Sequence, residues 1–338
     1  MNLGQILKES IITLEKECIS TAELDAKIII EQVLSVDRSF LLTHPEFTVK
    51  KIDNFRIKNL IKKRSKNLPI AYITGQREFF GYDFIVNKAV LIPRPETEFL
   101  VEEGVDFLKG KISRHPAQSE GSHDANTKDG MINVLDLGTG SGCIIISLAK
   151  ELAKQSPHDL GRTGKDVGFY ATDISKKALA VARKNSKRLL SFNVIPDCSS
   201  RSGILLSRTA TKQPITFLRS NLLKNKKLPK MFDLILANLP YVPEHFTSTA
   251  SIDATDVKSD ISFEPKSAIF AEDNGAAIIK EFINQSKNRI NNNGLILIEL
   301  DPRNAKELEQ FARIMLPEAK IELKKDLAQR DRYLEISF

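Results

Sequence analysis

A short apolar strand, a glycine-rich turn and an apolar helix follow one another between residues 132 and 150. The strand covers residues 132–137, the turn reads Gly138-Thr139-Gly140-Ser141-Gly142, and the helix covers residues 143–150. Glycines at such a turn let the backbone approach a nucleotide-like ligand closely at the helix N-terminus. The spacing G-x-G-x-G after an acidic residue favours an adenosine ligand without a pyrophosphate. The segment therefore predicts an α/β fold with a parallel sheet.

A carboxylate ends the next predicted strand, residues 168–173. Asp173 at its end is placed to accept hydrogen bonds from both hydroxyls of a ribose, as in nucleotide-binding α/β folds. Asp136 lies at the end of the preceding strand. Because the carboxyl ends of parallel strands meet at the edge where open α/β sheets bind ligands, these positions predict one site.

The tetrapeptide Asn238-Leu239-Pro240-Tyr241 follows a third apolar run, residues 232–237, which predicts another buried strand. The Asn238 amide offers a carbonyl and an NH2 group, so it can orient another planar amide or amino group. Pro240 removes a backbone donor and stiffens the turn, and Tyr241 supplies a flat ring for stacking. This combination favours a site that presents a planar NH2 group as a nucleophile.

The composition indicates a protein with a large buried core, without a redox-active cysteine pair and without a membrane-spanning segment. The 338 residues are 41% hydrophobic, which suffices for one large and one small domain. The cysteines Cys18, Cys143 and Cys198 have neither metal-ligand nor redox spacing, and no apolar run reaches membrane length. We therefore expect a cytoplasmic protein without a metal site, in which Cys143 is a small buried helix residue rather than a reactive thiol.

The chain divides into a helical part, a connecting part and a sheet-containing part. Residues 1–70 carry helical periodicity and predict a small helical domain. Its Lys/Arg-rich stretch 50–66 could meet RNA or an acidic partner, but a solvated helix face is the preferred interpretation. Residues 71–98 predict an extended linker with a hairpin or extended segment at 83–92, and residues 99–338 predict the larger domain.

Polar stretches interrupt the larger domain, and late strands complete it. The stretches 113–130, 155–165 and 198–214 carry Gly, Ser, Asn and charge without periodicity, and predict surface insertions. The segments 295–300, 321–325 and 332–337 predict strands, the last two antiparallel to each other.

Two further motifs connect these features to one family. They are PIAYITGQREFFG at residues 69–81 and VLIPRPETE at residues 90–98. Together with the strand-end motifs, they resemble the class I S-adenosylmethionine-dependent methyltransferases and, within that class, the HemK/PrmC family. That family methylates the side-chain amide nitrogen of a glutamine in peptide chain release factors. The likeness covers nearly the whole chain, from residues 22–26 to residues 326–332.

The resemblance implies a Rossmann-like methyltransferase sheet with a small N-terminal helical domain that recognises the substrate. It implies S-adenosyl-L-methionine as cofactor and the GGQ-loop glutamine of class I release factors as substrate, without a membrane or an obligatory nucleic acid. The residues implied to bind the cofactor are Gly138, Thr139, Gly140, Ser141, Gly142, Asp173, Leu222 and Asn238. Those implied to be catalytic are Asn238, Pro240 and Tyr241. Those implied to contact the substrate are Asn238, Leu239, Pro240, Tyr241, Arg94 and Glu96.

The sequence departs from the family pattern at three places. Leu239 stands where the family usually has a proline, and Asn-Leu-Pro-Tyr is also the form found in ribosomal RNA adenine dimethyltransferases. Asn221 stands where the family usually has an acid that contacts the cofactor, and residues 299–302 replace a glycine-bearing turn. Three alternatives stay open: a ribosomal-protein glutamine methyltransferase, an RNA or DNA adenine N6-methyltransferase, and a non-enzymatic binding module on this fold.

Overall fold

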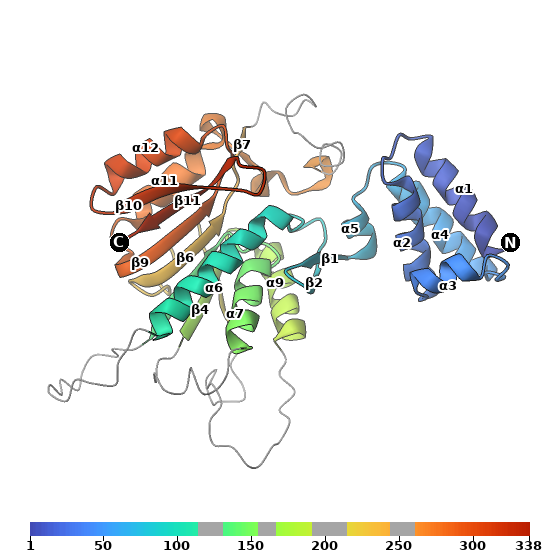
Figure 1. Cartoon of the computed structure of the whole chain (residues 1–338), viewed down its shortest axis with the longest axis horizontal. Helices are drawn as coiled ribbons and strands as arrows, with labels where there is room; N and C mark the ends of the chain where they lie inside the picture. The colour runs from blue at the N-terminus through green and yellow to red at the C-terminus, as the bar shows by residue number, and fades with distance from the viewer. Residues whose placement is uncertain (114–130, 155–166, 191–214, 244–260) are drawn as a thin grey trace, which may run out of the picture. The chain divides into compact units, whose positions relative to one another are not determined.

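The computed structural model describes residues 1–113, 131–154, 167–190, 215–243 and 261–338 (Figure 1). The described residues form two compact units. The first holds Met1–Arg77, Val86–Lys88 and residues 261–265; the second holds Glu78–Ile85, Lys266–Phe338 and the described residues between 89 and 243. Apart from Ser113, the polar stretches predicted as insertions lie outside the described residues, as does Cys198.

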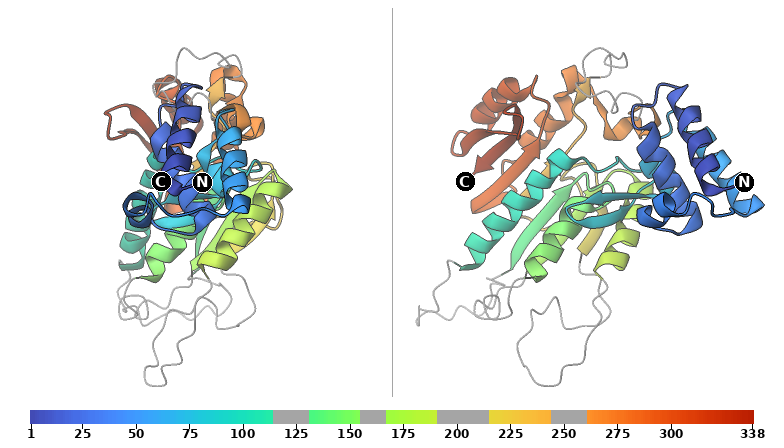
Figure 2. Two further views of the ribbon diagram at one scale, coloured as in Figure 1. Left: turned by 90° about the vertical axis from the view of Figure 1, so that its right-hand side faces the viewer. Right: turned by 45° about the vertical axis from the view of Figure 1, so that its right-hand side comes forward.

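The first unit is helical, as the periodicity of residues 1–70 predicts. Its helices are α1 (Leu3–Glu15), α2 (Ala22–Leu34), α3 (Arg38–Thr43), α4 (Lys51–Arg64) and α5 (Ile70–Thr74). They pack around their own core, which includes Leu3, Ile29, Ile30 and Ile57 (Figure 2, blue). The lysines of 50–66 are exposed, as expected of a solvated helix face. Arg64 is the exception, since it is buried and its Nε lies 2.6 Å from Asp25 Oδ2.

The second unit contains a seven-stranded sheet in the order β10-β11-β9-β6-β3-β4-β5. The strands are β3 (Ile132–Leu137), β4 (Val167–Asp173), β5 (Ile215–Arg219), β6 (Phe232–Asn238), β9 (Ile290–Glu299), β10 (Lys320–Lys325) and β11 (Asp331–Ser337). Strands β9, β6, β3, β4 and β5 are mutually parallel, whereas β11 runs antiparallel to both β9 and β10. The predicted parallel sheet with late antiparallel strands is therefore confirmed, although β9 begins five residues earlier than expected.

Helices cover both faces of this sheet because successive strand residues point to opposite sides. Val134, Leu234 and Leu236 pack with α6 (Glu98–Ser113), α7 (Cys143–Ala153) and α9 (Lys176–Leu189) on one face. Leu135, Leu137, Ile235 and Ala237 pack with α11 (Ala277–Ser286) and α12 (Ala305–Met315) on the other. Helices α6 and α7 lie side by side on their face (Figures 1 and 2). This alternation decides which strand residues can meet at the edge of the sheet.

A hairpin precedes the large sheet, and most of it lies earlier than residues 83–92. Strands β1 (Gln76–Phe79) and β2 (Tyr82–Ile85) pair around Phe80 and Gly81, whose φ angles are +54° and +72°. Positive φ at both central residues is typical of the tight two-residue turns that match strand twist. The hairpin lies within the predicted extended or hairpin linker 71–98, and β2 ends at Ile85, so only the first residues of the segment 83–92 belong to it.

Shorter elements connect the larger ones. They are η1 (Pro95–Thr97), η2 (Ile261–Phe263), η3 (Lys266–Ala268), η4 (Asp273–Gly275) and the parallel pair β7 (Val242–Pro243) and β8 (Phe270–Ala271). Among the described residues, no helix is long and apolar enough to cross a membrane. Of the short elements, η1 and η4 matter most, because each contacts the tetrapeptide 238–241 that begins at the last residue of β6.

Candidate active site

The glycine turn, Asp173 and Asn238 lie at the carboxyl edge of neighbouring strands β3, β4 and β6, beside the end of β9. Register fixes this arrangement: Leu137 is paired with both Ala237 and Thr172, and Asn238 is paired with Glu299. The glycine turn, Asp173 and Asn238 therefore leave adjacent strands at the same level. All of these residues belong to the second unit. The strands of the second unit thus form the predicted ligand edge.

The glycine turn is bound tightly to its neighbours. The backbone N–H groups of Gly138 and Thr139 both donate to the carbonyl of Thr172, and that of Gly142 donates to the Thr139 carbonyl. Gly142 has a φ of +83°, and a Cβ there would lie 2.8 Å from Ile146 Cδ1. A side chain at Gly142 would therefore clash as well as strain the backbone. The turn holds helix α7 close to the end of β3.

Asp173 links the turn to the start of α9. Its Oδ2 accepts from the Gly140 N–H at 3.0 Å, and its Oδ1 accepts from the Ser175 N–H at 2.7 Å. Burial raises the pKa of the Asp173 carboxyl, and these two hydrogen bonds oppose that shift. Since a carboxylate has about four acceptor sites, each oxygen keeps capacity for a further donor.

Asp136 lies beneath the turn and is completely buried. Its Oδ2 accepts from the Thr139 hydroxyl at 2.6 Å, whereas its Oδ1 has no side-chain or backbone partner in the described structure. Burial is the main cause that raises the pKa of Asp136 to about 7. An unpartnered buried acceptor of this kind is uncommon and suits a site whose remaining donor comes from a ligand.

The raised pKa of Asp136 predicts a pH dependence of stability. The folded chain keeps a proton on Asp136 between about pH 4 and pH 7, where the unfolded chain has lost it. The stabilisation from Asp136 is therefore complete below about pH 4 and is lost as the pH rises through about 7. Relative to Asp136→Asn, the free energy of unfolding of the wild type should fall by roughly 1.4 kcal/mol per pH unit in this window. Urea titrations from pH 4 to pH 8 measure this difference.

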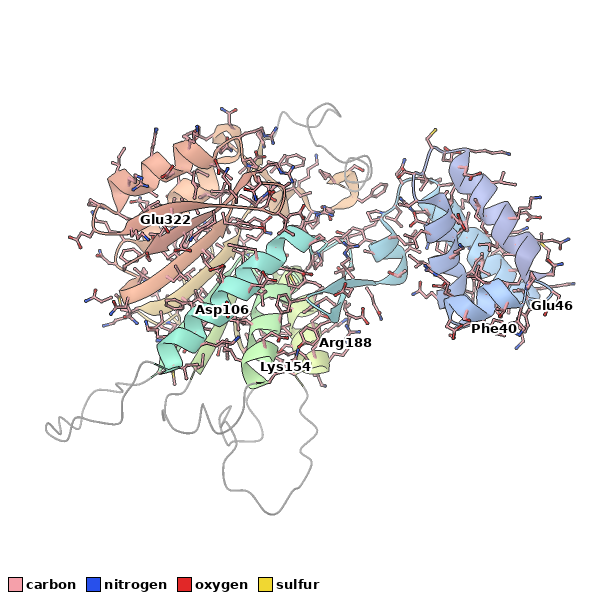
Figure 3. All side chains as sticks on the ribbon, viewed as in Figure 1. Phe40, Glu46, Asp106, Lys154, Arg188 and Glu322 are labelled. Atoms are coloured by element: carbon pink, nitrogen blue, oxygen red, sulfur yellow. The ribbon has the colours of Figure 1, made fainter. Side chains whose placement is uncertain are left out.

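The control for this prediction is Asp106→Asn, because the Asp106 side chain is 77% exposed on α6, where Figure 3 labels it. That variant should keep the wild-type pH profile. Parallel stability profiles for wild type and Asp136→Asn would show that Asp136 titrates normally.

Asn238 is held by two residues that come from distant parts of the chain. Its Nδ2 donates to Thr97 Oγ1 and to Glu299 Oε2, both at 2.9 Å, and the Thr97 hydroxyl donates to the same Glu299 oxygen at 2.7 Å. The side-chain hydrogen bonds of Asn238 among the described residues all use Nδ2. The amide oxygen Oδ1 is therefore left to accept a hydrogen bond from a ligand.

Tyr241 contacts the same carboxylate. Its hydroxyl donates to Glu299 Oε1 at 3.0 Å, and its ring packs against the apolar core beneath α11 and α12. Burial raises the pKa of the Tyr241 hydroxyl well above its usual value, and the charge of Glu299 adds to the shift. Burial likewise raises the pKa of Glu299, against the hydrogen bonds from Thr97 and Tyr241 and the positive charge of Arg332.

The remaining predicted residues lie around this edge. Leu239 is 4% exposed and packs over the turn, with its Cδ2 3.1 Å from where a Cβ on Gly138 would lie. Pro240 is half-buried between Asn238 and Tyr241. Leu222, with a φ of +50°, follows β5, and its side chain packs into the apolar core. Leu239 therefore fills the space beside the turn where the family usually has a proline.

Arg94 immediately precedes η1, and Glu96 lies within it. Arg94 is half-buried, and its positive charge lowers the raised pKa of Tyr241; Glu96 is exposed, and its carbonyl accepts from the Tyr333 hydroxyl at 2.6 Å. The structure thus places both residues at the border of the Asn238 site. Their contact with a substrate stays a prediction.

Thr97 and Glu299 are site residues that the sequence analysis did not identify. Thr97 lies inside the VLIPRPETE motif, where only Arg94 and Glu96 were assigned. Glu299 ends the apolar run of β9, so the argument that singled out Asp136 and Asp173 applies to it as well. A polar residue at the end of a buried strand was therefore the available signal.

Comparison with known proteins first defines the class. A family model for the PrmC N-terminal domain matches residues 5–75. The chain is 29% identical to the bifunctional methyltransferase of Rickettsia bellii over 347 aligned residues, covering 99% of this chain and 55% of the relative. It therefore spans about half the length of that relative. The α/β sheet with a ligand edge and these matches define a methyltransferase, and the predicted fold class is confirmed.

Closer relatives define the family. The chain is 34% identical to the release factor glutamine methyltransferase of Leptospira interrogans, covering 88% of this chain and 85% of the relative. It is 30% identical to the protein of that name from Rhodopirellula baltica, covering 93% and 88%. The chain belongs to the release factor glutamine methyltransferase (HemK/PrmC) family, which confirms the resemblance.

Among solved structures, the chain is similar to the catalytic domain of hMettl16 in complex with the MAT2A 3'UTR hairpin 1. The TM-score is 0.48 at 17% sequence identity, and the match covers 88% of this chain and 84% of that one. The amino-terminal domain of human METTL16 in complex with SAH has a TM-score of 0.43 at 16% identity, covering 91% and 94%.

Proposed function

We propose that this cytoplasmic protein transfers the methyl group of S-adenosyl-L-methionine to a glutamine side-chain amide nitrogen in the GGQ loop of class I peptide chain release factors. One observation carries the proposal: Asn238 presents an unoccupied amide oxygen at the sheet edge beside the glycine turn. An acceptor in that position suits a substrate NH2 group. The names of the relatives from Leptospira and Rhodopirellula support the same substrate.

The residues of the turn fit an adenosine-bearing methyl donor. Asp173 keeps acceptor capacity on both oxygens for ribose hydroxyls, and the buried Oδ1 of Asp136 lacks a partner. Residues 138–142, Asp173 and the segment at Leu222 would therefore hold S-adenosyl-L-methionine. When bound, it supplies a methyl group that its sulfonium charge activates for transfer.

The chain's own residues would act by positioning. An amide nitrogen is a poor nucleophile because its lone pair is delocalised into the carbonyl. Asn238 Oδ1 would accept one hydrogen of the substrate NH2, and the main-chain carbonyl of Leu239 or Pro240 would accept the other. Fixing a nucleophile in this way can lower a barrier by roughly 7–11 kcal/mol. Pro240 has no N–H, so at that residue the turn offers the substrate an acceptor only.

Asp173→Ala should weaken S-adenosyl-L-methionine binding strongly. Two charge-assisted hydrogen bonds to ribose hydroxyls are worth about 1.5–3 kcal/mol each, so the affinity should fall at least about 100-fold. Isothermal titration calorimetry measures the change, with Asp106→Ala at an exposed position of α6 as the control. Because Asp173 also holds Gly140 and Ser175, thermal melting of the variant is recorded alongside. Unchanged affinity would remove Asp173 from the cofactor site.

The substrate is identified by mass spectrometry after incubation with an isotopically labelled methyl donor. Release factor, ribosomal proteins and RNA are offered in separate reactions. Label should appear on the glutamine of the release-factor loop, and a loop Gln→Asn variant should stay unlabelled because its nitrogen falls short of the methyl group. Label in RNA, in a ribosomal protein or in that loop variant would refute the assignment and favour one of the alternatives.

The helical unit, residues 1–70 in the predicted division, would bind the folded release factor away from the loop. Its match to the PrmC N-terminal domain supports this role. Such binding would give affinity for the whole factor that a short loop peptide lacks. The Michaelis constant for intact release factor should accordingly lie well below that for the peptide.

A further inference from the structure

We propose that Glu299 is a positioning residue of the methyl-transfer site, which fixes the direction in which the Asn238 amide faces the substrate. The inference deepens the proposed function and rests on it for the identity of the substrate. Glu299 touches neither substrate nor methyl donor in this role. It acts through Asn238.

The hydrogen bonds of Asn238 fix the direction of its amide. A planar amide can be turned over, exchanging its oxygen and its NH2 group. Both hydrogens of Asn238 Nδ2 are used, by Thr97 Oγ1 and Glu299 Oε2 at 2.9 Å. Turning the amide over would bring its oxygen against a carboxylate oxygen at hydrogen-bond distance. Since an ionised carboxylate only accepts hydrogen bonds, the turned-over form is repelled.

The Glu299 carboxylate is itself held in place. Glu299 is 1% exposed, and three donors converge on it: Thr97 and Asn238 on Oε2, and Tyr241 on Oε1. Strand pairing of Asn238 with Glu299 sets the spacing between β6 and β9. Thr97, 2% exposed, closes the arrangement from η1. The carboxylate therefore has little freedom to follow a moving amide.

The burial of the Glu299 carboxylate costs free energy of folding. Burying a carboxylate is unfavourable unless its hydrogen bonds offset the lost hydration, and burial does raise the pKa of Glu299. An apolar side chain of similar volume would fill the same space without that cost. The presence of a carboxylate at this position is thus better explained by its orientation of the Asn238 amide than by a contribution to the stability of the fold.

A fixed Asn238 amide would also discriminate between substrates. Its Oδ1 accepts a hydrogen bond from a glutamine NH2, but it repels the carboxylate oxygen of a glutamate of the same shape. If Glu299 were absent, Asn238 could turn over and this discrimination would weaken. The carboxylate would therefore act on both the rate and the choice of substrate.

The test compares three variants of the full chain. Glu299→Leu removes both carboxylate oxygens but keeps a side chain of similar volume. Glu299→Gln keeps one oxygen as the acceptor for Thr97 and Asn238, and its NH2 group donates a hydrogen bond to the Tyr241 hydroxyl oxygen. Asp301→Asn is the matched control, because Asp301 is a 7% exposed carboxylate two residues along that pairs with Arg303 instead. The single-turnover rate with saturating S-adenosyl-L-methionine should fall about 100-fold in Glu299→Leu. Cofactor affinity and the Michaelis constant for the methyl acceptor should change only a few-fold.

Recovery of the rate in Glu299→Gln distinguishes a role in orienting Asn238 from a role in the stability of the fold. Glu299→Gln should recover most of the rate, and Asp301→Asn should match the wild type. Should Glu299→Leu fail to fold, the pair Thr97→Val and Thr97→Ser replaces it, with loss expected for Val and recovery for Ser. A wild-type rate in Glu299→Leu would overturn the proposal, and so would a wild-type rate in Thr97→Val where that pair is used. Equal losses of rate in Glu299→Leu and Glu299→Gln would also overturn it.

The rates are measured on whichever substrate the wild type labels, so a wrong substrate assignment does not affect this comparison. A readout without substrate is the side-chain amide signal of Asn238 in protein labelled with 15N at asparagine. Its two protons should exchange slowly in the wild type and in Glu299→Gln, and rapidly in Glu299→Leu. Slow exchange in Glu299→Leu would equally overturn the proposal.

Discussion

Replacing Asn238 with alanine should lower the rate of methyl transfer by about 100- to 1000-fold, the range seen when one oriented polar group is removed from an active site. The alanine side chain offers no acceptor for the substrate NH2. Nothing else in the described structure would replace it, because Thr97 Oγ1 and Glu299 Oε2 both accept their hydrogen bonds from Asn238 Nδ2 itself. Affinity for S-adenosyl-L-methionine should change only a few-fold, since the glycine turn and Asp173 are untouched.

The measurement is a single-turnover assay with saturating S-adenosyl-L-methionine and release factor, alongside calorimetric titration of the cofactor. Asn292→Ala is the control, because Asn292 is an exposed asparagine on β9 away from the site. It should match the wild type in both assays. If Asn238→Ala keeps a normal single-turnover rate, the mechanism that relies on amide orientation is wrong. A large loss of cofactor affinity instead would move Asn238 from the chemistry to cofactor binding.

The sheet and its ligand edge were predictable because they depend on local patterns. Continuous apolar runs at 132–137 and 232–237 predict buried parallel strands, and the glycine turn fixes where the first strand gives way to a helix. Once the strands are parallel neighbours, their last residues must lie together. Asp173, Asn238 and the turn could therefore be assigned to one site from the sequence alone.

The contacts that hold Asn238 were not predictable in the same way. Thr97 is 141 residues from Asn238 along the chain, and 202 residues from Glu299. Their meeting depends on the pairing of β6 with β9 and on η1 leading into α6 over the same face of the sheet. Residues 299–302 were interpreted only as a missing glycine-bearing turn. Sequence reasoning can identify a polar strand end, but not which distant hydroxyl will reach it.

The contact between η4 and the tetrapeptide is a second feature that only the structure reveals. Gly275 has a φ of +92° and lies directly against the backbone of Tyr241. Asn304 reinforces this turn, because its Nδ2 donates to the carbonyl of Asn274 at 2.7 Å. The sequence Asp273-Asn274-Gly275 predicts a turn. It does not predict that this turn contacts Tyr241, which lies 34 positions earlier in the chain.

Gly275→Ala should therefore damage both stability and activity. A Cβ at this position would lie 2.0 Å from the Tyr241 carbonyl oxygen and 2.7 Å from its carbonyl carbon. Both atoms belong to the backbone, so no side chain can rotate away, and the positive φ adds strain of its own. The loss in free energy of unfolding should be at least about 2–3 kcal/mol. Relief requires a shift of η4 or of the Tyr241 backbone, and Tyr241 donates to Glu299 within the site, so the rate of methyl transfer should fall as well.

Gly110→Ala is the matched control for this prediction. Gly110 lies in α6, and a Cβ there would meet no atom within 4 Å. Alanine at this helical position should raise stability by about 0.5–1 kcal/mol and leave the rate unchanged. Urea unfolding and single-turnover labelling of both variants provide the comparison. If Gly275→Ala were as stable and active as Gly110→Ala, the close approach of η4 to Tyr241 would be refuted, and with it the view that η4 holds the tetrapeptide in place.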